Sequence, residues 1–239
     1  MEGKTANFAK VLGNMKNLFD RYKFFLGISL GVSVAILALF YNALAPEKRL
    51  PIFQPAMVNY ELVDSSLQHI KKYHKIAPFS LINQNGITIT EKAYADKIYV
   101  ADFFFTTCPT ICPKMTANMG LIQDAIREDH QVRLVSFSVT PKIDSVAQLK
   151  KYALEKQVDD SIWNLLTGDK KQIYELARKS YLAVKNDGDG GPHDMIHTEN
   201  FILIDPDKRI RGFYDGTDTA AMKTLLSDIK ILKDEYPIP

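Results

Sequence analysis

The sequence contains very little cysteine, with only Cys108 and Cys112 in a chain of 239 residues. Two cysteines are too few for a disulfide framework, and a chain of this length can bury a core without one. An excess of either charge is also absent, because 30 Lys and Arg face 28 Asp and Glu. Proteins that bind nucleic acid usually carry a basic face or stripe. We therefore expect neither a disulfide scaffold nor a nucleic-acid partner.

Charge is missing altogether from Phe24 to Tyr41, a run of 18 residues. As a helix this run would be about 27 Å long, close to the roughly 30 Å hydrocarbon core of a bilayer. Basic residues at Lys16, Arg21 and Lys23 precede it, which favours a cytoplasmic N-terminus. A cleaved signal peptide is the alternative, since residues 43–45 read Ala-Leu-Ala. A retained anchor is favoured because the apolar run is longer than the apolar region of a usual signal peptide, and because Pro46 follows the possible cleavage site.

The N-terminal segment is a poor mitochondrial presequence, because such presequences are rich in arginine and avoid acids. We therefore expect a single-pass protein of a bacterial inner (cytoplasmic) membrane, with its body on the periplasmic side. A stretch with three prolines and no periodicity follows the anchor and resembles a tether. The predicted organisation is an N-terminus at 1–23, an anchor at 24–44, a tether at 45–66 and a functional body at 67–239.

Strand-like and helix-like patterns alternate in the body, with hairpins at both ends. The strand signals are a hairpin in Pro78–Thr90 around Asn85-Gly86, buried runs at Lys97–Phe105 and Val132–Val139, and a strand–turn–strand at Asn200–Gly216. The helix signals are Lys114–Glu128, Ser145–Glu155, Lys170–Lys179 and Thr219–Lys233. This order predicts an α/β domain with a mixed sheet.

The two cysteines lie where a buried strand passes into a helix. A thiol at a helix N-terminus has a lowered pKa. Four positions apart on a helical turn, the two Cβ atoms are about 5–6 Å from each other. Modest bending would close a disulfide, and two thiolates would equally bind Cu(I) or Zn²⁺. From spacing alone a redox pair and a metal site are both possible. Both interpretations are favoured over two cysteines that only fill the core.

A metal needs further ligands, and the five histidines of the chain are candidates. His69, His74 and His130 lie in polar stretches and are expected at the surface. His193 and His197 lie in the glycine-rich stretch GDGGPHDMIHTEN, which leads into a strand. His197 is nearer that strand, so its position is the better fixed of the two.

Other soft or acidic groups near the motif have simpler explanations. Met115 and Met119 share helical spacing with Ile122 and Ile126, which indicates core residues rather than ligands. Asp144 follows a strand at a place where functional groups collect in this type of fold. An acid at a helix N-terminus is its more ordinary interpretation.

Two segments, TTCPTICPKM and SVTPKIDS, carry recognisable motifs. They resemble the Cys-Pro-x-x-Cys-Pro motif and the Ser-x-Asp-Pro-x-x-Asp-Thr turn of the Sco/SenC copper-chaperone family, within the thioredoxin superfamily. WNLLTGDKKQIYELARKSYLAV and HTENFILIDPDKRIRGFYDGT resemble two later segments in the same order. The resemblance covers roughly residues 76–232 and implies a thioredoxin-like fold. Thr140 stands where the family has its first turn acid, and Asp144 aligns with the second.

The resemblance implies that Cys108 and Cys112 are copper thiolates and that His197 is the third ligand, for Cu(I) and Cu(II). No family ligand position matches His193. The implied function is a metallochaperone, not an enzyme, that delivers copper to the binuclear site of cytochrome c oxidase. The implied partners are the copper-bearing oxidase subunit, other copper chaperones and thioredoxin-like reductants.

An enzyme is the alternative, namely a membrane-anchored thiol-disulfide reductase acting on the cysteines of that oxidase site. Its redox-active pair would again be Cys108 and Cys112. Thioredoxin-like oxidoreductases usually carry Cys-x-x-Cys, and one more residue intervenes here. A peroxiredoxin-like peroxidase is a third possibility, but such enzymes carry a threonine three positions before the reactive cysteine. Phe105 occupies that position in this chain.

Overall fold

The computed structural model describes residues 2–44, 48–58, 66–184, 196 and 198–237. The chain forms two compact units, residues 1–48 and residues 49–239. The first unit holds one helix, α1 (Glu2–Leu44). Its portion Arg21–Leu44 has a mean hydropathy of 2.3, so it is long and apolar enough to cross a membrane.

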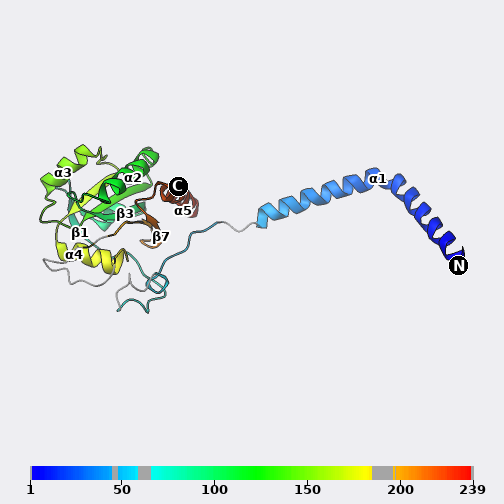
Figure 1. The fold of residues 1–239 in the computed structure, drawn as a ribbon, viewed down its shortest axis with the longest axis horizontal. Coiled ribbons are helices and arrows are strands. Elements are labelled where there is room, and N and C mark those ends of the chain that lie inside the picture. The colour runs from blue at the N-terminus through cyan, green and yellow to red at the C-terminus, as the bar shows by residue number, and fades with distance from the viewer. Residues whose placement is uncertain (1, 45–47, 59–65, 185–195, 197, 238–239) are drawn as a thin grey trace. The chain divides into compact units, whose positions relative to one another are not determined.

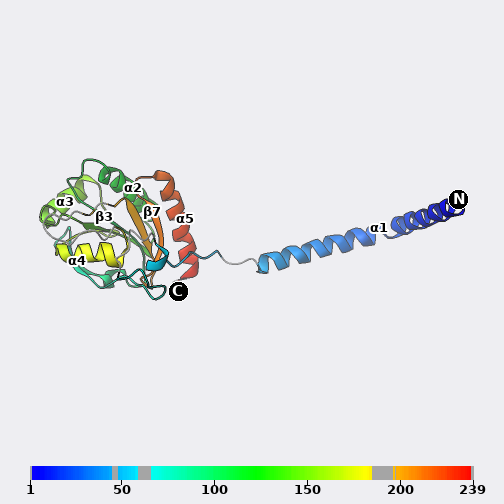
Figure 2. The ribbon, with the colours of Figure 1, turned by 60° about the horizontal axis from the view of Figure 1, so that its bottom comes forward.

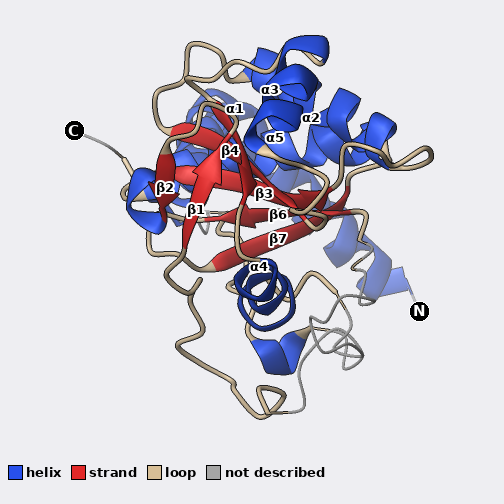
Figure 3. Ribbon diagram, turned by 90° about the vertical axis from the view of Figure 1, so that its left-hand side faces the viewer, coloured by secondary structure: helices blue, strands red, loops and turns tan. Residues whose placement is uncertain are grey.

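The second unit, called the body below, is built on one seven-stranded sheet (Figure 3). Its strand order is β2-β1-β5-β4-β3-β6-β7. The strands are β1 (Ser80–Asn83), β2 (Thr88–Thr90), β3 (Ile98–Phe104), β4 (Val132–Ser138), β5 (Trp163–Thr167), β6 (Asn200–Ile204) and β7 (Ile210–Asp215). The three central strands β5, β4 and β3 are parallel, and all the other pairings are antiparallel. The sheet is therefore mixed, as predicted.

Helices cover both faces of the sheet, as the views of Figures 1 to 3 show. One face carries α2 (Cys112–Ala125), α3 (Val146–Glu155) and α5 (Thr219–Glu235). The other face carries α4 (Lys170–Glu175) with its continuation η4 (Leu176–Ser180), and η3 (Glu91–Tyr94). Every residue of β3 is buried, since this strand lies between two covered faces.

The hairpin, the buried strands and the final helix agree with the sequence. Gly86 adopts φ 76° in the turn between β1 and β2, a conformation that glycine reaches without strain. Helix α2 begins at Cys112, two residues before the predicted start, with Pro113 in its first turn. Strand β5 has no counterpart among the elements expected from periodicity. It is a five-residue segment fixed by pairing with β4 and β1.

Part of the predicted tether belongs to the body and packs against the edge of its sheet. Residues 50–57, which we call the strap, include a backbone bridge between Phe53 and Ile210 of the edge strand β7. The Phe53 ring also meets Phe213 edge to face, at 5.3 Å between centroids. The remaining boundaries of the four-part organisation stay predictions.

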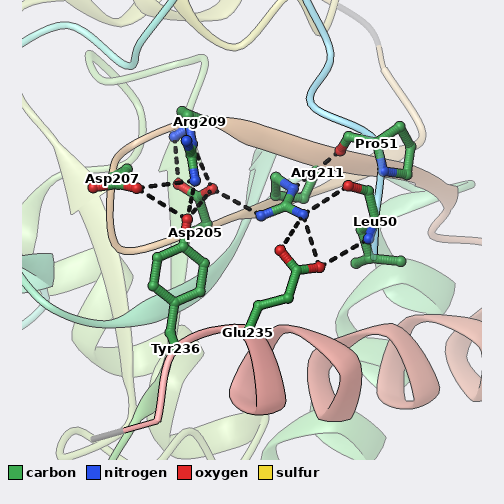
Figure 4. A network of polar contacts seen from close by, with 8 residues as sticks. All are labelled: Leu50, Pro51, Asp205, Asp207, Arg209, Arg211, Glu235 and Tyr236. Carbon is green, nitrogen blue, oxygen red and sulfur yellow. Dashed lines mark hydrogen bonds and ion pairs between the residues drawn. The ribbon is translucent and has the colours of Figure 1, made fainter. Parts of the chain in front are cut away.

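A buried ionic network holds the strap, as Figure 4 shows. Arg211 donates to the carbonyl oxygens of Leu50 and Pro51 at 2.7 and 3.0 Å. The same guanidinium pairs with Asp205 at 3.0 Å and with Glu235 at 2.7 Å. Arg211 is 2% exposed and Asp205 is fully buried, so these charges depend on one another for their hydrogen bonds.

His74 is buried, so its predicted surface position is wrong. Its Nε2 lies 2.7 Å from the carbonyl oxygen of Ser180. Its backbone N–H donates to Gln54 of the strap at 2.9 Å. Burial lowers the pKa of His74. A polar sequence neighbourhood gave no sign of these partners, which come from distant parts of the chain.

Candidate functional site

Both cysteines lie where β3 ends and α2 begins, and neither is in a disulfide. The backbone N–H of Cys112 donates to the sulfur of Cys108 at 3.5 Å. The Thr110 hydroxyl lies 3.8 Å from the same sulfur. Cys108 and Cys112 are both buried, whereas Pro109 and Thr110 between them are exposed. The pair is therefore shielded but lies directly behind a loop that another molecule can contact.

The two thiols have opposite electrostatic environments. Burial alone would raise the pKa of Cys108, but hydrogen bonds from Cys112 and Thr110 outweigh it and lower this pKa from 9.0 to about 7. Burial raises the pKa of Cys112 to about 12, and the neighbouring Cys108 and Asp102 add to the increase. Near neutral pH the Cys108 thiol is thus partly ionised while Cys112 keeps its proton.

Asp102 of β3 contributes a further buried carboxyl on this side of the sheet. The strand alternates between the two cores: Val100 and Phe104 belong to the same core cluster as the cysteines, whereas Ala101 and Phe103 belong to the opposite one. Asp102 therefore faces the side of the cysteines. Its Oδ1 has no hydrogen-bond partner among the described residues. Burial raises its pKa from 3.8 to about 7, partly offset by a hydrogen bond from Ser136.

A cavity of about 270 Å³ opens beside Cys108. It is lined by Thr106, Cys108 and Pro113 on one side and by side chains of α3 on the other, among them Gln148 and Tyr152. The Tyr152 hydroxyl is held by Thr116 of α2 at 2.7 Å. The reactive sulfur thus has open space next to it for an incoming group.

Asp144 stands at the N-terminus of α3, in agreement with its more ordinary interpretation. It immediately precedes the N-cap Ser145, whose side chain accepts from the Gln148 N–H. Asp144 is fully buried and accepts hydrogen bonds from the backbone and the hydroxyl of Thr106, in the cysteine loop. The sequence drew attention to Asp144, but nothing in it indicated this partner.

His193 and His197 lie outside the described residues, so the third ligand stays a prediction. In the described part of the chain no three His, Cys, Asp or Glu side chains come together as a metal site. The residues just after His197 are described: the Glu199 carbonyl accepts from the Gly216 N–H at 2.6 Å. The Gly216 carbonyl in turn accepts from Asn118 of α2 at 2.8 Å. The segment that follows His197 is thus tied to the helix that begins with Cys112.

The remaining candidates behave as the sequence indicated. Met115 and Met119 are 0% exposed, in the core between α2 and the sheet, so their assignment to the core is confirmed. His69 and His130 are exposed. The residues near the cysteines that sequence reasoning missed are Asp102 and Thr106. The sequence signal for Asp102 was its position as a single acid inside an apolar strand.

The chain is similar in sequence to known proteins. The sequence profile of the SCO1/SenC family matches residues 68–232. The SCO1 protein homolog of Bacillus subtilis (strain 168) is 35% identical over 159 residues, which are 66% of this chain and 82% of that protein.

Two solved structures also resemble the chain. BsSco, described as a member of the Sco family of cytochrome c oxidase assembly proteins with a disulfide switch, has a TM-score of 0.58 at 35% identity. It aligns over 66% of this chain and 93% of its own. Bradyrhizobium japonicum ScoI, solved with copper bound, has a TM-score of 0.54 at 27% identity, over 67% of this chain and 99% of its own. These structures confirm the expected thioredoxin-like fold, and with the profile they show that the chain belongs to the SCO1/SenC family.

Proposed function

We propose that this protein binds copper through Cys108, Cys112 and His197 and delivers it to the binuclear copper site of cytochrome c oxidase during assembly. The observation that carries this proposal is the pair of free thiols at the start of α2, with the Cys108 sulfur 3.5 Å from the Cys112 N–H. Two soft sulfur donors and an imidazole suit copper. Related proteins have been solved with copper bound, which supports the same cargo here.

Transfer would proceed by ligand exchange without any net oxidation. The Cys108 thiol is already partly ionised near neutral pH, and the proton of Cys112 must leave for the second sulfur to bind. When thiolates of the partner take over the metal one ligand at a time, protons return to the two cysteines. The cavity beside Cys108 gives the incoming side chain room.

The position of His197 as third ligand is supported by the segment that follows it. Strand β6 runs antiparallel to β3, pairing Ala101 with Ile202 and Tyr99 with Ile204. Asn200, where β6 begins, therefore lies toward the end of β3 that leads to the cysteines. His197 precedes Asn200 by three residues.

The membrane anchor would assist the delivery of copper to the oxidase. We place α1 in a bacterial inner membrane as a single span, with the body on the periplasmic side. Confinement of donor and acceptor to one membrane surface raises their effective concentration. The length and hydropathy of the helix Arg21–Leu44 support a membrane span.

A copper titration of the reduced body, residues 49–239, tests the proposal. We expect one copper per chain and, with Cu(II), an intense near-ultraviolet thiolate charge-transfer band. His197→Ala should weaken binding by roughly tenfold or more, whereas His193→Ala, the matched control in the same stretch, should not. Equal affinity of the two variants would remove His197 from the site.

A thiol-disulfide reductase is the second candidate, and the unequal thiols favour it. The Cys108 thiolate would attack a disulfide of the partner, forming a mixed disulfide and releasing one partner thiolate. Cys112, after losing its proton, would then attack the Cys108 sulfur and release the second partner thiolate. The partner gains two electrons and the pair becomes a disulfide, so a thioredoxin-like reductant is needed for another cycle. Free thiols that give no copper band but reduce a disulfide peptide would favour this function.

A further inference from the structure

Asp144 is a fully buried carboxylate at the end of the sheet that carries the cysteines. Four donors satisfy it: the Thr106 N–H at 3.2 Å and three hydroxyl groups, those of Thr106 at 2.5 Å, Ser138 at 2.6 Å and Thr140 at 3.1 Å. All four donors are neutral. A buried carboxylate is costly unless its oxygens are hydrogen-bonded, so these bonds fix the groups around it.

Thr106 links this carboxylate to the cysteine loop. It stands two residues after the end of β3 and two residues before Cys108. Its hydroxyl donates to Asp144 and accepts from Gln148 of α3 at 3.0 Å. Because the hydroxyl is used both as a donor and as an acceptor, its rotation is fixed. The backbone N–H of Thr106 is held by the same carboxylate.

The rest of the loop is held by local contacts before α2 begins, among them that of the Thr110 hydroxyl, 3.8 Å from the Cys108 sulfur. The Cys108 N–H donates to the Phe105 carbonyl at 3.3 Å, and the Cys108 sulfur accepts from the Cys112 N–H at 3.5 Å. The second bond keeps a sulfur atom above the first turn of the helix. It is a long and weak contact, so its persistence depends on how firmly the chain before Cys108 is held.

We propose that Asp144 is a positioning residue that, through Thr106, holds the Cys108 sulfur over the start of α2. It touches neither cysteine in the structure and acts only through the loop. The inference rests on the proposed function for its copper readout, but the geometry it describes applies equally to a reductase.

The test compares Asp144→Asn with Asp205→Asn in the full chain in detergent. Asp205 is also fully buried and hydrogen-bonded, but lies near the start of β3, at the other end of the sheet. Both variants should unfold at lower urea concentration. Only Asp144→Asn should raise the midpoint of the alkylation pH profile of Cys108 in metal-free protein, from about 7 toward the ordinary 9.0. Its copper affinity should fall roughly 10–100-fold, as for other residues that orient metal ligands.

A milder pair of variants covers the case in which Asp144→Asn does not fold. Thr106→Val and Thr140→Val each replace one hydroxyl donor to Asp144 with a methyl group, but only Thr106 belongs to the cysteine loop. We expect Thr106→Val to shift the Cys108 midpoint upward and Thr140→Val to leave it in place. Equal midpoints in these two variants, or equal shifts in Asp144→Asn and Asp205→Asn, would overturn the inference. If the unmodified protein binds no copper, the proposed function fails, while the alkylation profiles still decide the role of Asp144.

Discussion

The two ends of the sheet satisfy a buried carboxylate in different ways. Near the start of β3, Asp205 pairs with Arg209 at 2.8 Å and with Arg211 at 3.0 Å, and the Tyr236 hydroxyl adds a hydrogen bond at 3.0 Å. At the cysteine end, Asp144 has only neutral donors. The first arrangement ties the strap and α5 to the edge of the sheet (Figure 4). The second restrains the cysteine loop through Thr106.

This difference indicates a division of tasks within the body. Charged pairs that are buried contribute strongly to stability only while every member is present, because removing one leaves another without a partner. A carboxylate that receives only neutral hydrogen bonds restrains its neighbours without an ionic network, and Thr106 of the cysteine loop is one of these neighbours. We therefore expect mutations in the Arg211 network to act on stability and mutations near Asp144 to act on the thiols.

The largest expected effect is that of Arg211→Met. The substitution keeps much of the side-chain volume but removes the donors to Leu50, Pro51, Asp205 and Glu235. Loss of one partner from a buried ionic network costs roughly 3–5 kcal/mol. Urea unfolding of residues 49–239 measures this, and the alkylation profile of Cys108 serves as the control. A shifted Cys108 profile in a folded variant would contradict the separation of the two ends.

Removal of the strap, which contacts the same end of the sheet, should lower the free energy of unfolding by a smaller amount. A chain that begins at Leu67 lacks the Leu50 and Pro51 carbonyls, the Phe53 ring and the Gln54 side chain that binds the His74 N–H. Hydrogen bonds to a charged group contribute about 1.5–3 kcal/mol each, but water can replace part of them here, so we expect a loss of about 2 kcal/mol. Comparison of the urea midpoints of residues 49–239 and 67–239 measures it. Equal midpoints would show that the strap is only a tether.

The smallest expected effect, taken per unit of pH, is a pH dependence of stability due to Asp102. Its pKa is 3.8 as an ordinary group and about 7 when buried in the fold. Between about pH 4 and pH 7 the folded protein keeps this proton and the unfolded chain has lost it, so the contribution of Asp102 to stability falls as pH rises. Asp102→Asn removes this dependence, which amounts to at most about 1.4 kcal/mol per pH unit.

The measurement is the stability of Asp102→Asn relative to the unmodified body at pH 5 and at pH 7. We expect the stability of the variant relative to the unmodified protein to increase as pH rises. Above about pH 7 the difference in their free energies of unfolding should become constant. Asp205→Asn is the control, since Asp205 is an equally buried acid that pairs with Arg209 and Arg211. A difference that does not change between pH 5 and pH 7 would show that Asp102 is ionised in the fold.

Much of the fold could be predicted because its signals are local. Asn85-Gly86 indicated the first hairpin, the apolar run at Lys97–Phe105 indicated a buried central strand, and the Asp205-Pro206-Asp207 turn separated the last two strands. The spacing of Met115 and Met119 indicated a helix that packs against the sheet. Strand β5 gave no such signal, because it is short and gains its hydrogen bonds from β4 and β1.

The sequence alone determined the apolar anchor segment, the alternation of strands and helices, and the two cysteines at a strand–helix junction. These follow from hydrophobic periodicity and spacing, which act between neighbours in the chain. Only the tertiary structure decided that residues 50–57 pack on the body, that His74 is buried, and that Asp144 holds Thr106. The partners in these contacts are 38 to 161 residues apart, so the folded sheet and helices bring together groups that no local pattern connects.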